Sequence, residues 1–162
     1  MTTIKIKLYG GLHFGAILKY PNSGMTARQT RFFAHAKSAA EMSDFRVRVG
    51  AVIVLGKQIL SAGFSSTRSH SIQARYDKYR NFRSGSEPKH SLHAEMMALI
   101  PLMNDKDIDW KRVEIYVFRI CGDREFGMAR PCASCMAALT QYGIRNIFYT
   151  TDIGFAYEQV AV

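Results

Sequence analysis

The sequence predicts an α/β protein in which a mixed central sheet has helices on both faces. Two observations favour this class. Apolar runs indicate strands, and segments with helical periodicity separate them, in the order helix, hairpin, helix, strand, helix, strand. The first two strands are joined by a tight turn and therefore pair antiparallel, whereas crossover helices between the later strands imply parallel pairing. With 162 residues, 48% of them hydrophobic, the chain is expected to form one domain.

The first part of the chain predicts an extension, a helix and a hairpin. Residues 1–24 are expected to be an irregular or short-strand extension rich in glycine. Apolar spacing predicts a helix over residues 25–42. Its apolar side is formed by Ala27, Phe32, Phe33, Ala36, Ala39 and Ala40. Residues 45–55 and 58–64 are predicted strands, joined by a two-residue turn that begins at Gly56.

A polar and strongly basic insertion, residues 65–90, follows the hairpin. Only Asp77 and Glu87 are acidic in it. Its basic residues include Arg68, Arg75, Lys78, Arg80, Arg83 and Lys89. A short helical piece is expected around residues 71–79. Ser91 is predicted to cap the next helix, which covers residues 92–100 and which Pro101 should kink or end.

The remaining elements alternate between strand and helix. Residues 112–120 form a predicted buried strand, and residues 121–130 a loop marked by glycines. A helix is expected over residues 131–142, because proline suits its first turn and glycine follows its end. Residues 144–150 predict a further strand. Residues 151–162 give no clear signal.

Charge and composition indicate the class of partner. The formal net charge of +9 favours anionic partners such as nucleotides, phosphorylated metabolites or nucleic acid, the alternative being a basic surface that only aids solubility. The sequence contains no apolar run of about 18 residues, so no membrane span is predicted. The first seven residues alternate polar and apolar without a signal-peptide core, so we expect a cytoplasmic protein. Cys121, at the end of an apolar run, is expected to be a buried bystander.

A split motif contains the residues that predict chemistry: His93-Ala94-Glu95, and then Pro131-Cys132-Ala133-Ser134-Cys135. One imidazole and two thiolates are enough to hold a zinc ion with its fourth position open. A carboxylate two residues from the imidazole can move protons. An open zinc site beside an acid/base group is typical of a hydrolytic catalyst. Alone, the two cysteines are also compatible with a redox pair or half of a closed zinc site.

Helical geometry limits how these residues meet. Cys132 and Cys135 are three positions apart, so on a helix they project within about 60° of one another. In a first turn, the helix dipole lowers their thiol pKa. His93 and Glu95 are about 200° apart around a helix. They serve one site only if the end of their helix, rather than its side, points at the metal. The sequence therefore predicts two helix N-termini converging on one ion.

The two halves of the motif together resemble the cytidine deaminase superfamily of zinc deaminases. The resemblance covers residues 26–150 and implies a three-layer α/β/α cytidine deaminase-like fold. It implies that His93, Cys132 and Cys135 bind one catalytic zinc ion, with a water or hydroxide in the fourth position. By the same resemblance, Glu95 moves protons between the water, the ring nitrogen and the departing amino group.

The substrate is less strongly indicated. Relatives often have Gly-x-Asn at the end of the second strand, where this chain has Ser65, and serine, glutamate or phenylalanine where it has Arg130. These two residues and Ala94 are the predicted substrate contacts. Arg130 could reach a substrate phosphate or face solvent. The long insertion is similar to that of deoxycytidylate deaminases, especially viral ones, and its basic residues could hold a 5′-phosphate.

The resemblance predicts a zinc-dependent hydrolase that deaminates cytosine in a free pyrimidine nucleotide, dCMP to dUMP. It also implies a homo-oligomer and a possible nucleotide effector, dCTP or dTTP. Two alternatives stay open. One is a cytosine or adenine deaminase acting on single-stranded DNA or RNA, for which the basic charge and aromatic residues such as Tyr76, Phe82, Phe126 and Phe155 would form a groove. The other is a zinc-stabilised nucleic-acid-binding module without catalysis.

Overall fold

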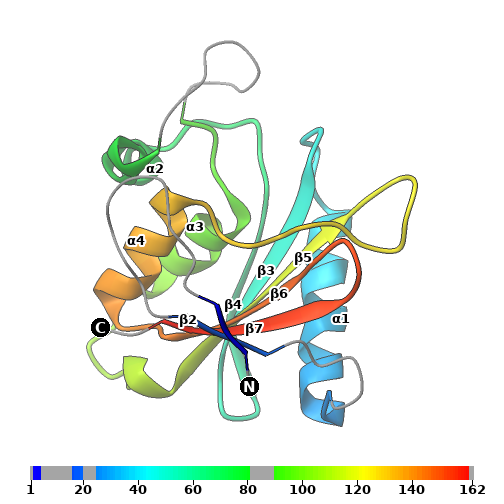
Figure 1. Cartoon of the computed structure of the whole chain (residues 1–162). Coiled ribbons are helices and arrows are strands. Elements are labelled where there is room, and N and C mark those ends of the chain that lie inside the picture. Colours follow the sequence, from blue (N-terminus) through cyan, green and yellow to red (C-terminus); the bar gives the residue numbers. More distant parts are fainter. Residues whose placement is uncertain (1, 5–15, 20–24, 81–89, 161–162) are drawn as a thin grey trace.

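A mixed sheet forms the centre of the structure, a computed structural model that describes residues 2–4, 16–19, 25–80 and 90–160 (Figure 1). Within these residues the sheet has seven strands in the order β1-β2-β7-β6-β5-β3-β4. They are β1 (Thr2–Ile4), β2 (Ala16–Lys19), β3 (Arg48–Leu55), β4 (Gln58–Phe64), β5 (Val113–Ile120), β6 (Asn146–Thr150) and β7 (Phe155–Val160). Only β5 and β6 pair in parallel among these strands.

Helices cover both faces of the sheet, so the predicted three-layer arrangement is confirmed. Helix α1 (Ala27–Glu41) packs against β3 and β5 on one face. Helices α3 (Ala94–Leu99) and α4 (Ala133–Tyr142) lie on the other, with α2 (Ser71–Tyr76) and the 3₁₀ turn η1 (Asp77–Tyr79) beside α4. None of the described helices is long and apolar enough to cross a membrane.

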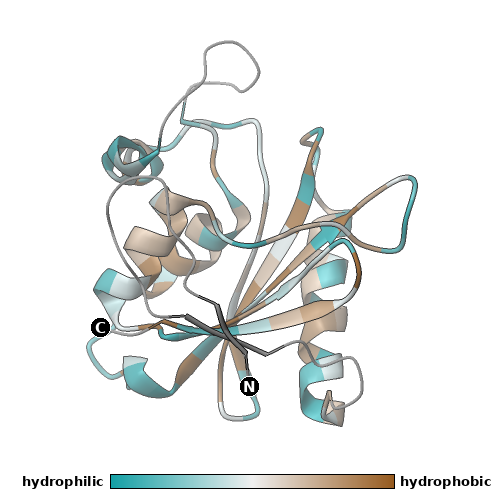
Figure 2. Ribbon diagram, viewed as in Figure 1, coloured by the Kyte–Doolittle hydropathy of each residue, from teal (hydrophilic) through white to brown (hydrophobic). Residues whose placement is uncertain are grey.

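Each face of the sheet has its own core. Under α1, Phe32 and Phe33 pack with Tyr116, whose ring stacks on Phe148 at a centroid distance of 4.4 Å. On the other face, aliphatic residues of β3 and β5 meet α3 and α4. Alternate residues of β3 serve the two cores, because successive side chains of a strand point to opposite faces. In Figure 2 the hydrophobic residues gather on the central strands and on α1.

The predicted helix and hairpin of the first half are confirmed, with no end more than three residues from its predicted position. Thr26 caps α1, and its hydroxyl accepts from the Gln29 N–H while the Gln29 side chain accepts from the Thr26 N–H. The turn between β3 and β4 needs a left-handed residue, which Gly56 supplies with φ +62°. The helical piece expected at residues 71–79 is α2 followed by η1.

Two sequence predictions need correction, and one segment without a clear signal contains a strand. Ser91 does not cap a helix: it forms a β-bridge with Ser69, and α3 begins later, with His93 as its N-cap residue. Helix α4 begins at Ala133, two residues after Pro131, with Cys132 at its N-cap. The last segment contains a strand, β7, that pairs antiparallel with β6. Its residues give little local signal because its stability comes from the neighbouring strands β6 and β2.

Most other boundaries agree with the sequence. The α-helix α3 ends at Leu99, and a 3₁₀ turn containing Pro101 follows it, as a proline there requires. Gly143 ends α4 in the left-handed conformation with φ +99°. The described parts of the extension, β1 and β2, add to the sheet edge next to β7. The rest of residues 1–24 lies outside the described residues.

Candidate metal centre and active site

Strand directions place the two halves of the split motif together. Strands β4 and β5 both run antiparallel to β3, so they point the same way. The chain leaves β4 toward α3 and leaves β5 toward α4, and therefore both helices begin at the same edge of the sheet. His93 is the N-cap residue of α3 and Cys132 that of α4, while Cys135 lies in the first turn of α4. The predicted convergence of two helix N-termini is confirmed.

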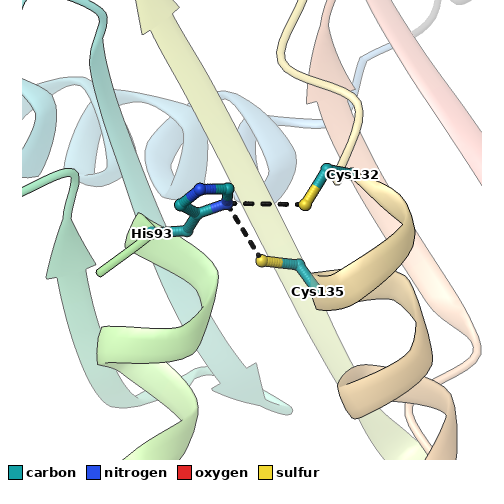
Figure 3. Close-up of side chains that lie close together, drawn as sticks. All are labelled: His93, Cys132 and Cys135. Atoms are coloured by element: carbon teal, nitrogen blue, oxygen red, sulfur yellow. Dashed lines mark hydrogen bonds between the residues drawn. The ribbon is translucent and has the colours of Figure 1, made fainter. Parts of the chain in front are cut away.

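His93, Cys132 and Cys135 form a compact cluster (Figure 3). The Nδ1 atom of His93 lies 3.4 Å from the Cys132 Sγ and 3.5 Å from the Cys135 Sγ. Candidate ligand atoms of all three residues lie within 4.8 Å of one another, and no other such group of three is found in the described part of the chain.

These distances fit zinc. Tetrahedral bonds of about 2.1 Å to nitrogen and about 2.3 Å to sulfur place the two ligand atoms about 3.6 Å apart. The Arg80 Nη1 atom lies 3.0 Å from the His93 Nε2 atom. Because a guanidinium only donates, Nε2 accepts, and the proton of a neutral ring lies on Nδ1, directed at the sulfur atoms. A neutral imidazole that binds zinc through Nδ1 has its proton on Nε2, so zinc binding there would require this ring to change tautomer. His93, Cys132 and Cys135 are thus positioned to hold one zinc ion.

The two thiols have opposite pKa shifts. A hydrogen bond from Cys135 and the proximity of His93 lower the pKa of Cys132 well below its ordinary value, against the effect of burial. The same thiol–thiolate contact, together with burial, raises the pKa of Cys135. Burial alone lowers the pKa of His93, but hydrogen bonding to Cys132 and the negative charges of Cys132 and Glu95 raise it overall. Cys132 is therefore the more acidic of the two thiols.

Glu95 lies in the first turn of α3, two positions after the N-cap residue His93. Its side chain is buried, and this burial raises the pKa of its carboxyl, with the positive charge of His93 acting in the opposite direction. A carboxyl whose pKa is raised toward neutral pH is a stronger base and can still give the proton up again, which suits a group that moves protons in both directions. Its position supports the predicted role, which stays a prediction.

A cavity of about 270 Å³ adjoins the cluster and is lined by His93, Glu95 and Cys132. The three predicted substrate contacts, Ser65, Ala94 and Arg130, also line it. Sequence reasoning did not single out two further lining residues, Phe45 and Arg119. Arg119 lies near the end of the mostly buried strand β5, and no local feature of the sequence marks it as a cavity residue. Arg80 also lines the cavity. In the sequence, the only feature that marked Arg80 was its place among the basic residues of the insertion.

The polar groups of two predicted contacts are engaged by the protein itself. The Ser65 hydroxyl donates to the Val47 carbonyl at 2.7 Å and accepts from the Val49 N–H at 3.0 Å. The Arg130 guanidinium donates twice, at 2.8 Å each, to the fully buried carboxylate of Glu158. The sequence predicts the Arg130 side chain either at a substrate phosphate or in solvent, and it does not indicate this ion pair with Glu158. Whether either residue contacts substrate stays a prediction.

The insertion contributes less charge to the cavity than its composition suggests. Of its described basic residues only Arg80 lines the cavity, while Arg83 and Lys89 lie outside the described residues. The aromatic residues proposed for base stacking mostly pack in the cores: Tyr76 is 5% exposed, and Phe126 and Phe155 contact one another. Phe82 also lies outside the described residues. Cys121 is half-buried and does not belong to the metal cluster.

Comparison with known proteins agrees with this geometry. Residues 26–151 match the family model described as the cytidine and deoxycytidylate deaminase zinc-binding region. No curated protein is similar enough in sequence to match the chain.

Solved structures share the fold. A dCMP deaminase from the cyanophage S-TIM5, in apo form, superposes with a TM-score of 0.55 at 20% identity, covering 78% of this chain and 86% of that one. The structure of the same enzyme in complex with dCMP and dUMP superposes with a TM-score of 0.55 at 20% identity, covering 78% of this chain and 83% of that one. A cytidine deaminase from Burkholderia pseudomallei superposes with a TM-score of 0.56 at 17% identity, covering 84% of this chain and 93% of that one.

Proposed function

Because the chain belongs to the cytidine and deoxycytidylate deaminase family, we propose that it removes the amino group of cytosine in a free nucleotide, dCMP, by hydrolysis. The reaction consumes one water and releases dUMP and ammonia. The enzyme class, a zinc-dependent hydrolase of the deaminase type, follows from the family. The cytosine nucleotide and the roles of individual residues are our proposal.

The residues of the cluster divide the chemistry among them. His93, Cys132 and Cys135 would hold zinc, which when bound makes a water molecule nucleophilic near neutral pH. Glu95 would take a proton from the attacking water and deliver it to the ring nitrogen beside the reacting carbon. It would then take the second proton of that water from the newly added hydroxyl group and pass it to the amino group, which leaves as ammonia. The burial of Glu95 and its place in the cavity wall support this assignment.

The cavity wall supports a phosphorylated substrate. Arg80 and Arg119 both line it. The Arg119 guanidinium has no hydrogen-bond or ion-pair partner within the described part of the chain, whereas Glu158 neutralises Arg130. A guanidinium suits a 5′-phosphate because it donates two parallel hydrogen bonds. Ser65, Ala94 and Arg130 would then shape the wall around base and sugar. This free charge beside the metal cluster is the observation that favours a nucleotide over a nucleoside.

A substrate panel tests the proposal. The zinc-loaded protein is incubated with deoxycytidine, dCMP, dCTP, an adenosine analogue and a cytosine-containing oligonucleotide, and ammonia release is followed. We expect dCMP to give the highest kcat/KM, with a shallow dependence on salt, because only one phosphate is engaged. Reaction of the oligonucleotide, with dCMP inert, would overturn the proposal in favour of a nucleic-acid deaminase. A homo-oligomeric assembly, a dCTP or dTTP effector and a cytoplasmic location stay predictions.

A further inference from the structure

The insertion between β4 and α3 contains two buried polar residues that the proposed chemistry does not use. Gln73 in α2 is fully buried, and Asp77, the first residue of η1, is 2% exposed. They are four positions apart on one side of a helical segment that packs against α4. Neither of them lines the cavity. A buried carboxylate is costly unless donors surround it, so its position calls for a physical reason.

Asp77 accepts hydrogen bonds from three separate segments. Its Oδ1 atom accepts from the Gln73 Nε2 and from the Ser134 Oγ, each at 2.9 Å, and its Oδ2 atom accepts from the His90 Nδ1 at 2.8 Å. Burial alone raises the pKa of Asp77, but these hydrogen bonds lower it overall. The carboxylate is therefore the stable form.

These hydrogen bonds connect both segments that contain metal ligands. Ser134 lies between Cys132 and Cys135 in the first turn of α4. At the other end, the Gln73 Oε1 accepts from the backbone N–H of His93 at 3.1 Å. A continuous path thus runs from the His93 backbone through Gln73 and Asp77 to the turn that contains both cysteines. Among the described residues, no backbone–backbone hydrogen bond joins these two segments directly. Their direct hydrogen bonds involve the cysteine side chains, with His93 and with Glu95 as partners.

We propose that Asp77 and Gln73 are positioning residues that hold His93 at the correct separation from Cys132 and Cys135 for metal binding. The insertion then supports the metal centre in addition to any contact it makes with substrate. This inference depends on the metal cluster and not on which nucleotide is the substrate. Residues that orient metal ligands in this way commonly change metal affinity by about 10- to 100-fold when removed.

The chain offers a matched control. Tyr76 lies beside Asp77, and its hydroxyl donates to the Gln141 Oε1 at 2.9 Å. This hydrogen bond also joins the insertion to α4, but it lies at the far end of that helix, away from the cysteines. Tyr76→Phe therefore removes one hydrogen bond between the same two elements without touching the path to the ligands.

Zinc affinity tests the proposal directly, in the absence of nucleotide. The zinc dissociation constant is measured by competition with a chromophoric chelator for the wild type, Asp77→Ala, Asp77→Asn, Ser134→Ala and Tyr76→Phe. The absorption spectrum of the Co²⁺-loaded protein provides a second readout of ligand geometry. We expect Asp77→Ala to raise the dissociation constant by about 10- to 100-fold. Ser134→Ala should raise it less, and Asp77→Asn least of the three, because an amide oxygen still accepts from Gln73 and Ser134.

The comparison with Tyr76→Phe decides the outcome. If Asp77→Ala and Ser134→Ala change zinc affinity and the Co²⁺ spectrum no more than Tyr76→Phe does, these residues serve the fold alone and the proposal is wrong. If Asp77→Ala does not fold, the comparison of Ser134→Ala with Tyr76→Phe decides by itself. A protein that binds zinc as expected but does not act on dCMP would overturn the proposed function and leave this inference standing.

Discussion

The Nδ1 atom of His93 lies 3.4 Å from the Sγ atom of Cys132, although 39 positions separate the two residues in the chain. The contact exists because β4 and β5 run in the same direction on either side of β3, so that the helices after them begin at one edge. The metal cluster is consequently complete only when β3, β4 and β5 are paired. Zinc binding and folding of this part of the sheet should therefore be coupled.

Glu95→Gln is expected to lower kcat by about 100- to 10,000-fold, because an amide cannot take up and release the proton. Zinc content should stay at that of the wild type, since Glu95 does not belong to the ligand cluster. Ammonia release and metal analysis of the same preparation check both points. A variant that retains more than a tenth of the wild-type rate would show that another group moves the proton.

Arg119→Ala is expected to raise KM for dCMP by about 10- to 100-fold, through loss of charged hydrogen bonds to phosphate, with little change for deoxycytidine. Steady-state kinetics on both substrates measure this difference. Arg124→Ala is the matched control, because Arg124 is more exposed, pairs with Asp152 and does not line the cavity. Equal effects of Arg119→Ala on both substrates would contradict a phosphate contact.

Gly63→Ala is expected to destabilise the protein by about 1–3 kcal/mol or more and to weaken zinc binding. A Cβ atom at Gly63 would lie 2.4 Å from the Ala94 carbonyl oxygen, so α3 would have to move away from β4. His93 and Glu95 lie at the end of α3 that moves. Urea unfolding and chelator competition measure the two effects. Gly122→Ala, where a Cβ meets no atom within 4 Å, should change neither.

Arg130→Met is expected to cost about 3–5 kcal/mol of unfolding free energy, because it leaves the buried charge of Glu158 without its partner. The second change Glu158→Leu should recover much of this loss, since the pair is replaced by apolar side chains. Arg124→Ala breaks an exposed pair and should cost no more than about 1 kcal/mol. Denaturant unfolding of the single and double variants checks these values, and a cost below that of Arg124→Ala would refute the argument.

Much of the fold was predictable because its signals are local. The amphipathic spacing of α1, the glycine turn between β3 and β4 and the glycine end of α4 each depend on residues within a few positions of one another. Strand β7 was not predicted, because its position is set by pairing with β2 and β6. The supposed cap Ser91 failed for the same reason: a bridge to Ser69 keeps its backbone extended.

By itself, the sequence predicted the candidate ligands, since the spacing of His93, Cys132 and Cys135 within two short segments specifies which groups can meet at two helix starts. The resemblance of this split motif to a known family predicted the class of reaction. Only the tertiary structure decided the partners of the other polar residues. Arg130 pairs with Glu158, 28 positions away, and Asp77 contacts Ser134, 57 positions away. A polar side chain takes the partner that the fold brings within hydrogen-bond distance, and that partner has no fixed place in the sequence.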